Sequence, residues 1–263
     1  MNLPGENMDS DGKKTSTFKK WWGLALPFVF LLGKAKWLLA LLKLSKLSTL
    51  LTMLIAVWAY AQLWGAPFAL GFVCLIYIHE MGHMLMMRKM GIKAGAPLFI
   101  PFVGAVIAMK ELPKNAWVES LVALGGPLLG TLGAAVSLVI AEYTKSNLWY
   151  ALASTGFLIN LFNMLPVSPL DGGRITGVIS RWFWLPGFGL GFLLFLKTHS
   201  PILFLILLLG CLSLFRSASK QNATYYDIPA PQRMGVAAVY FTLLFLMAAG
   251  MWFADQPLKG LIA

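Results

Sequence analysis

The sequence is poor in charged side chains, which make up only 12% of its 263 residues, whereas 59% of the residues are hydrophobic. Its mean hydropathy is +0.75. Soluble globular domains carry about 25% charged residues, so this composition excludes a soluble globular protein. Apolar stretches close to the roughly 20 residues that cross a bilayer as a helix recur along the chain. The composition therefore indicates an integral membrane protein.

Alternating segments and cysteine are also scarce, which narrows the possible kinds of membrane protein and of metal site. Segments that alternate apolar and polar residues are largely missing, which argues against an outer-membrane β-barrel. Cysteine occurs only at Cys74 and Cys211, both inside apolar stretches, where we expect small buried side chains. At about 100° per residue on a helix, Cys74 lies well off the face of His79. We therefore exclude Cys74 as a partner of that histidine in a metal site.

The apolar runs predict an all-α polytopic membrane protein with six to seven transmembrane helices. The segment 1–17 is polar, and Trp21–Lys46 is best interpreted as an amphipathic helix at the membrane interface, with lysines that extend toward water. We accordingly divide the chain into a cytoplasmic tail with this interfacial segment (1–46), a transmembrane domain (47–254) and a short C-terminal tail (255–263). The expected spans are 47–64, 67–87, 119–141, 148–166, 182–197, 201–215 and 234–254.

The net charge of +11 lies in the connections between these spans, not in a basic face of the kind that binds nucleic acid. If the N-terminus is cytoplasmic, every basic residue except Lys145, Lys197 and Lys259 falls on the cytoplasmic side. This asymmetry agrees with the positive-inside rule. The basic cytoplasmic surface would also attract anionic membrane lipid, so we expect lipid and not nucleic acid as a partner.

The most informative residues lie in the segment 71–91, GFVCLIYIHEMGHMLMMRKMG, which holds two of the three histidines of the chain. Ionisable groups are costly in hydrocarbon, so a His-Glu-x-x-His motif there indicates a functional site. His79 and His83 would lie about 40° apart around the helix and one turn apart along it, which lets both imidazoles reach one metal ion. Glu80 would then be placed to act on a water molecule at that metal as the general base.

Two histidines leave a catalytic zinc ion one protein ligand short of the usual three. Asp171 is the candidate because it follows an apolar span directly, in INLFNMLPVSPLDGGR. We expect Pro166 and Pro169 to stop the preceding helix. Gly172 and Gly173 would let the chain turn sharply, so that irregular backbone presents the carboxylate. Pairing of Asp171 with Arg174 at the interface is the alternative interpretation of this aspartate.

The motifs HEMGH and NMLPVSPLDGG together resemble the site-2 protease family of intramembrane zinc metalloproteases, over residues 67–175. This resemblance makes 67–175 the core of a protease domain. It implies that His79, His83 and Asp171 bind Zn²⁺, that Glu80 is the general base and acid, and that Asn163 helps to hold the substrate or the oxyanion. The implied substrate is a transmembrane protein or peptide, cleaved within or near its membrane segment.

Three other features bear on the resemblance. The segment Gly91–Glu111 resembles the membrane-associated β-region of the family and predicts either a short β-hairpin, whose open edge could bind substrate, or a re-entrant connection. Gly130 stands where the family often has asparagine, so no role is carried onto it. Asn160 shares a helix face with Asn163 by spacing, and we expect it to be an interhelical hydrogen-bond partner. Gly125, Gly126 and Pro127 predict close packing or a tight turn.

Two other functions fit an intramembrane His and Glu cluster: a zinc transporter, and a metal-binding protein that has lost catalysis. A transporter needs ligands along a path open to both sides, whereas the sequence offers one cluster near one face. Loss of catalysis is disfavoured by the intact Glu80. The compact chain resembles prokaryotic members of the family, which predicts a prokaryotic plasma membrane with the N-terminus and the active site toward the cytoplasm.

Overall fold

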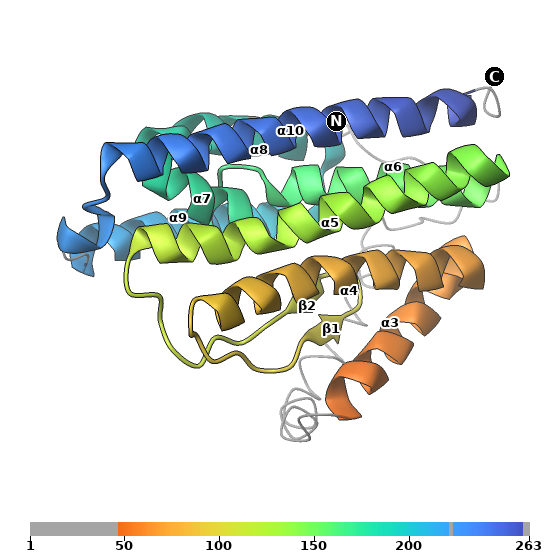
Figure 1. Ribbon diagram of the computed structural model, residues 1–263, viewed down its shortest axis with the longest axis horizontal. Helices are drawn as coiled ribbons and strands as arrows, with labels where there is room; N and C mark the ends of the chain where they lie inside the picture. The colour runs from red at the N-terminus through yellow and green to blue at the C-terminus, as the bar shows by residue number, and fades with distance from the viewer. Residues whose placement is uncertain (1–46, 221–222, 260–263) are drawn as a thin grey trace, which may run out of the picture. The chain divides into compact units, whose positions relative to one another are not determined.

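The computed structural model describes residues 47–220 and 223–259 (Figure 1). The chain divides into two units, Met1–Ser48 and Thr49–Ala263, and the described elements belong to the second apart from the first two residues of the first described helix. The interfacial helix predicted at Trp21–Lys46 lies outside the described residues.

The described chain is mostly helical, with one small sheet. Its helices are α3 (Leu47–Trp64), α4 (Ala66–Lys89), α5 (Ala116–Thr144), α6 (Asn147–Asn163), α7 (Asp171–Ile179), α8 (Trp184–Thr198), α9 (Pro201–Lys220) and α10 (Ala230–Lys259), with 3-10 turns at Arg181–Phe183 and Ala223–Tyr226. The strands are β1 (Leu98–Ile100) and β2 (Gly104–Val106). The predicted apolar runs each coincide with one of these helices, apart from a few residues at the ends. The main difference is at α10, which continues to Lys259 through the predicted C-terminal tail.

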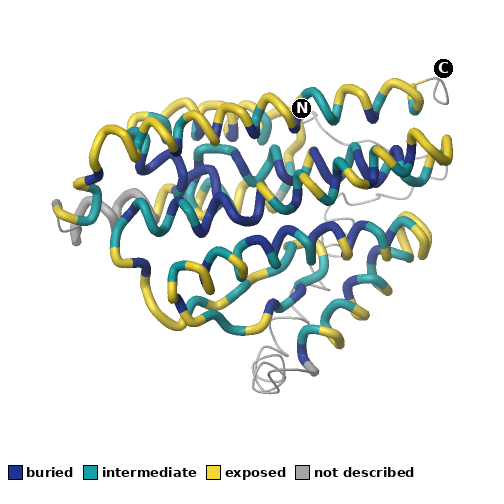
Figure 2. Tube along the Cα trace, viewed as in Figure 1, coloured by how far each residue is buried: buried dark blue, intermediate teal, exposed yellow. Residues whose placement is uncertain are grey.

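Three of the described helices are long and apolar enough to cross a membrane: Ala66–Lys89, Ala116–Thr144 and Ala230–Lys259. Shorter apolar helices lie at Ser48–Trp64, Trp184–Thr198 and Ile202–Leu212. This finding supports a membrane protein with three candidate spans. The larger number of six to seven spans stays a prediction. In Figure 2 the long helices carry exposed residues on their outer faces. On α5 and α10 these include large apolar side chains: Leu132, Val136, Val139, Phe241, Phe245 and Phe253.

An apolar surface of this extent is not stable in water and fits contact with lipid. Cys74 in α4 and Cys211 in α9 are also exposed, so the expectation that both are buried is wrong. The physical reason is that an apolar run in a membrane helix has a lipid-facing side as hydrophobic as its buried side. Composition alone therefore does not tell which side a cysteine occupies.

The buried core lies where α5 packs against α4, α6, α7 and α10. On one side, Ala123, Phe157 and Met247 pack in an apolar cluster contributed by α5, α6 and α10. On the other side, α4 and α5 approach through Gly82 and Gly125. A Cβ atom at Gly82 would overlap the carbonyl of Gly125, and one at Gly125 would overlap the carbonyl of Gly82. The close packing predicted around Gly125 is thus confirmed.

The segment predicted as a β-hairpin or a re-entrant connection forms a hairpin. β1 and β2 pair antiparallel, with Phe99 opposite Ala105. The outer edge of β1 is bonded to side chains of α3. The backbone N–H of Phe99 donates to Thr52 Oγ1 (3.2 Å), and Thr49 Oγ1 donates to the carbonyl of Pro97 (2.7 Å). α3 therefore covers the β1 edge of the sheet.

The chain around Asp171 differs from the sequence prediction. Asp171 is the first residue of α7, not part of an irregular turn, and both following glycines are helical. A Cβ atom at Gly172 would overlap the carbonyls of Met164 and Leu165, so glycine is needed there for close packing and not for a sharp turn. A carboxylate in the first turn of a helix is stabilised by the helix dipole. This placement favours the ionised form of Asp171.

Candidate metal centre

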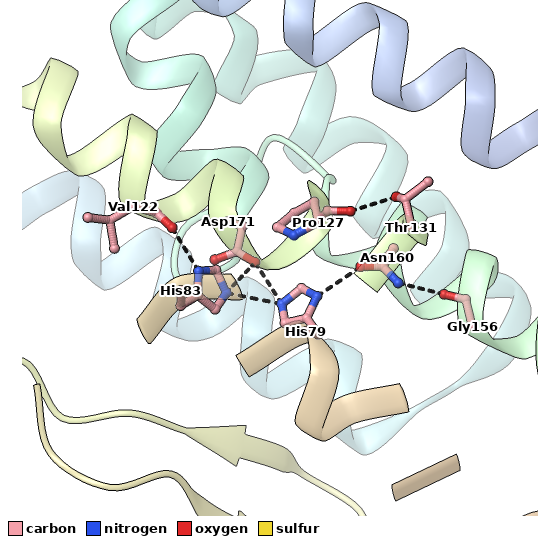
Figure 3. Close-up of polar contacts among 8 residues, drawn as sticks. All are labelled: His79, His83, Val122, Pro127, Thr131, Gly156, Asn160 and Asp171. Atoms are coloured by element: carbon pink, nitrogen blue, oxygen red, sulfur yellow. Dashed lines mark hydrogen bonds and ion pairs between the residues drawn. The ribbon is translucent and has the colours of Figure 1, made fainter. Parts of the chain in front are cut away.

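His79 and His83 lie on the face of α4 that packs against α5, one turn apart (Figure 3). Asp171 reaches the same point from the start of α7. The Nε2 atoms of the two histidines are 3.0 Å apart, and each is 3.2 Å from Asp171 Oδ2. His79, Glu80 and Asp171 are all buried. The structure thus brings together the three residues predicted as metal ligands, from segments far apart in the sequence.

The other ring nitrogen of each histidine is held by a hydrogen bond. His83 Nδ1 lies 2.8 Å from the carbonyl oxygen of Val122, which can only accept, so Nδ1 donates. His79 Nδ1 lies 2.8 Å from Asn160 Oδ1. Each Nε2 then turns its lone pair toward the other and toward the carboxylate of Asp171. Three electron-pair donors at this separation are held together by a cation, either a metal ion or a shared proton.

Burial opposes the ionised form of Asp171, but the positive charge of His83 in its protonated form and the hydrogen bonds from both imidazoles outweigh it. The pKa of the Asp171 carboxyl therefore lies well below its ordinary value. Because the folded-state pKa is depressed, this carboxylate is anionic at neutral pH and becomes protonated only in strong acid. The anionic form is the one that binds a metal ion.

These donors fit zinc. A tetrahedral zinc ion with bonds of about 2.0–2.1 Å keeps its ligand atoms about 3.3 Å apart, close to the spacing of the three donor atoms here. Two histidines and one carboxylate are also a donor set of catalytic zinc sites, which keep a fourth position open. Within the described part of the chain, His79, His83 and Asp171 are the group of histidine, cysteine and acidic side chains that could hold a metal ion.

The α5 backbone leaves room beside the donor atoms at Gly126. A Cβ atom on that glycine would overlap His83 Nε2 and would lie 2.6 Å from His79 Nε2. A side chain at this position would therefore fill the space in front of both rings. The sequence predicted only close packing here.

The two remaining predicted residues, Glu80 and Asn163, differ in their surroundings. Glu80 is buried on α4 and interacts electrostatically with His79, His83, Asp171 and Arg174. Asn163 is the last residue of α6 and is partly exposed. No side-chain hydrogen bond of Asn163 is seen among the described residues. Its amide is therefore free to bind another molecule.

Sequence reasoning missed the partners that orient the two rings. Asn160 was expected to be an interhelical hydrogen-bond partner, and it is one, but the side chain that it contacts is His79. The contact with the carbonyl of Val122 could not be found from the sequence, because every residue has the same backbone carbonyl group.

Comparison with known proteins gives an independent line of support. The sequence model of peptidase family M50 matches residues 67–146, which include His79, Glu80 and His83. A zinc metalloprotease of Methanocaldococcus jannaschii is 35% identical over 121 residues, which cover 44% of this chain and 34% of that protein. The chloroplast protein EGY2 of Arabidopsis thaliana, whose name describes a zinc metalloprotease, is 26% identical over 156 residues, covering 43% and 28%.

A solved structure of a site-2 protease from Methanocaldococcus jannaschii is also similar, with 21% sequence identity and a TM-score of 0.40. The match covers 78% of this chain and 85% of that chain. A TM-score this low does not establish a shared fold. The chain spans about a third of the length of the curated relatives it matches.

Proposed function

We propose that this chain, whose residues 67–146 match the sequence model of peptidase family M50, is an intramembrane zinc metalloprotease. Its substrates are membrane proteins or peptides, cut within or near their transmembrane segments. The resemblance to the site-2 protease family predicted from the motifs is confirmed by this family match and by the relatives that are zinc metalloproteases. The observation that carries the proposal is the meeting of His79, His83 and Asp171 beside a buried glutamate.

In the proposed mechanism, His79, His83 and Asp171 hold the zinc ion. A bound zinc ion supplies Lewis-acid chemistry, since it makes water a nucleophile near neutral pH and polarises the scissile carbonyl. Glu80 accepts a proton from the attacking water and returns it to the amine that leaves. Asn163 donates a hydrogen bond from its amide to the substrate carbonyl, where negative charge develops. The partial exposure of Asn163, and the lack of a side-chain hydrogen bond to it among the described residues, support this role.

We propose that the substrate strand pairs with β2. A transmembrane helix hides its carbonyls in its own hydrogen bonds, so it must unwind before cleavage, and pairing with a strand edge offsets the lost bonds. The β1 edge is occupied by Thr49 and Thr52 of α3. The outer edge of β2 carries no such cover among the described residues, and β2 lies on the α4 side of the hairpin.

We further propose a multi-pass topology in a prokaryotic plasma membrane, with six to seven spans and the metal centre nearer the cytoplasmic face. Support comes from the basic residues at the end of α4 and in the connection to α5, and from the shorter apolar helices beside the three candidate spans. Lipid is then a partner along the apolar outer faces, and nucleic acid is not a partner.

The first experiment separates metal binding from chemistry. We expect purified Glu80→Gln to keep one zinc ion and to lose cleavage of a model transmembrane peptide, because only the base is removed. Asp171→Ala should lose both zinc and cleavage, because one of three ligands is removed. His199→Asn is the matched control, since His199 is exposed on α8's C-cap, away from the cluster, and asparagine tolerates its positive φ of 51°.

Cleavage by Glu80→Gln at the wild-type rate would overturn the assigned base. Zinc in Asp171→Ala at wild-type affinity would overturn the ligand set. A zinc transporter remains the competing function, but neither of the relatives described above is named as a transporter. Zinc flux through proteoliposomes of the wild-type protein, without peptide cleavage, would favour it.

A further inference from the structure

Asn160 lies in the interior of α6, 3% exposed, with both ends of its side-chain amide engaged. Its Nδ2 donates to the carbonyl of Gly156 (2.8 Å), and its Oδ1 lies 2.8 Å from Nδ1 of His79 (Figure 3). A carbonyl oxygen only accepts, so the amide nitrogen must face Gly156 and the amide oxygen must face His79. The orientation of the amide is therefore fixed by its own helix.

This orientation determines which nitrogen of His79 carries the proton. An amide oxygen only accepts, so Nδ1 of His79 must be the donor, and in the neutral ring Nε2 then carries the lone pair. Nε2 is the atom that lies 3.0 Å from His83 Nε2 and 3.2 Å from Asp171 Oδ2. Asn160 thus holds His79 in the one neutral form whose lone pair points into the cluster.

The facing helix, α5, has a glycine and therefore no side chain at the point where this amide lies. A Cβ atom on Gly130 of α5 would overlap Asn160 Oδ1 and would lie 2.7 Å from Nδ2. The next glycine along α5, Gly133, differs, because a Cβ atom there would be 3.2 Å from the nearest atom, the Cγ2 methyl group of Ile78. The absence of a side chain at Gly130 is therefore specific to the space that Asn160 needs.

We propose that Asn160 is a positioning residue for the metal centre and that Gly130 is the space that lets it reach His79. Asn160 sets the tautomer and the ring orientation of His79, and it raises metal affinity without touching the metal or the substrate. The proposal rests on the proposed function, because it takes His79 as a zinc ligand. Outer partners of this kind typically change metal affinity by about 10- to 100-fold.

The test measures zinc affinity by competition with a chelator, on purified full-length protein in detergent. We expect Asn160→Ala to bind zinc about 10- to 100-fold more weakly than the wild type. Asn160→Asp keeps an acceptor oxygen toward Nδ1 but loses the donor to the carbonyl of Gly156, so it should restore part of the affinity that Asn160→Ala loses. Gly130→Ala should weaken binding as Asn160→Ala does, and the double variant should be no weaker than either single variant. Gly133→Ala is the matched control and should bind zinc normally.

A second measurement separates a positioning role from a general loss of structure. The chain has three histidines, so the imidazole N–H signals of the zinc-loaded protein can be assigned by NMR. We expect the Nδ1–H signal of His79 to be lost or strongly shifted in Asn160→Ala and kept in Asn160→Asp. The Nδ1–H signal of His83 should stay unchanged in both, because its acceptor is the backbone of Val122.

Wild-type zinc affinity together with an unchanged His79 signal in Asn160→Ala would overturn the proposal. Loss of both histidine signals in Gly130→Ala and Asn160→Ala, with no rescue by Asn160→Asp, would also overturn it, because the role would then be structural. Both readouts are independent of peptide cleavage. A zinc-binding protein that cuts no peptide would refute the proposed function and leave this inference standing.

Discussion

The metal centre is built from two regions that reach the same point by different means. In α4, the spacing of His79 and His83 on one helix sets their geometry, and the facing α5 backbone supports the rings. In the segment from the end of α6 to α7, the position of Asp171 depends on packing between elements. Gly172 packs on the carbonyl of Met164, Trp184 Nε1 donates to the carbonyl of Gly173 (2.9 Å), and Tyr240 Oη donates to the carbonyl of Met164 (2.7 Å).

This difference predicts how substitutions in each region affect metal binding and stability. A helix keeps two ligands one turn apart whatever its neighbours do, so damage on the α4 side should impair metal binding without unfolding the protein. The position of Asp171 depends instead on contacts between separate elements of the structure. Damage on the α7 side should therefore lower stability and metal binding together. The predictions below test this contrast.

The largest effect is expected at Gly126, on the α4 side of the contrast. Gly126→Ala puts a methyl group against the Nε2 atoms of His83 and His79. Displacement of a reacting group by about 1 Å can cost roughly 100-fold in rate, so we expect a loss of that order in peptide cleavage and weaker zinc binding. The melting temperature should change little, because alanine favours a helix. Gly133→Ala serves as control, and an equal loss of activity there would contradict the steric explanation.

An intermediate effect is expected at Gly172, on the α7 side. The methyl group of Gly172→Ala would overlap two backbone carbonyls, and overpacking of this kind costs about 1–3 kcal/mol. We expect a lower melting temperature and less bound zinc. Gly177→Ala is a control in the same helix, because its Cβ would be 3.6 Å from its nearest neighbour, Trp184. It should be neutral or stabilising by up to about 1 kcal/mol. Equal melting temperatures in the two variants would remove the contrast.

The smallest effect is expected at Tyr240. Tyr240→Phe deletes the hydrogen bond from α10 to the carbonyl of Met164, at 3% exposure, and should destabilise by about 0.5–1.5 kcal/mol. Thermal unfolding in detergent measures the change, with zinc content expected to fall slightly. Tyr143→Phe removes a hydroxyl from a side chain that is 92% exposed and should have no effect. A stable Tyr240→Phe protein with full zinc would show that α10 does not support the α7 side.

Much of this structure could be predicted from sequence, because the governing interactions are local. Apolar runs bounded by charges gave the helices, and His-Glu-x-x-His gave two ligands, since helix periodicity links neighbouring residues directly. α7 was not predicted as a helix because Gly172, Gly173 and Gly177 oppose helix formation by their propensity, which tertiary packing overrides here. Asn160 and Gly130 were not linked to the site because their contact joins separate helices. The role of Asn163 remains a prediction.

The contact between Gly82 and Gly125 has a mechanical consequence. At this point the main chains of α4 and α5 meet with no side chain between them. Neither helix can move closer to the other, or slide past it, without a clash between the two backbones. The contact therefore sets the separation of α4 and α5 at this point. His83 directly follows Gly82, so this fixed contact between the two main chains lies beside one of the proposed metal ligands.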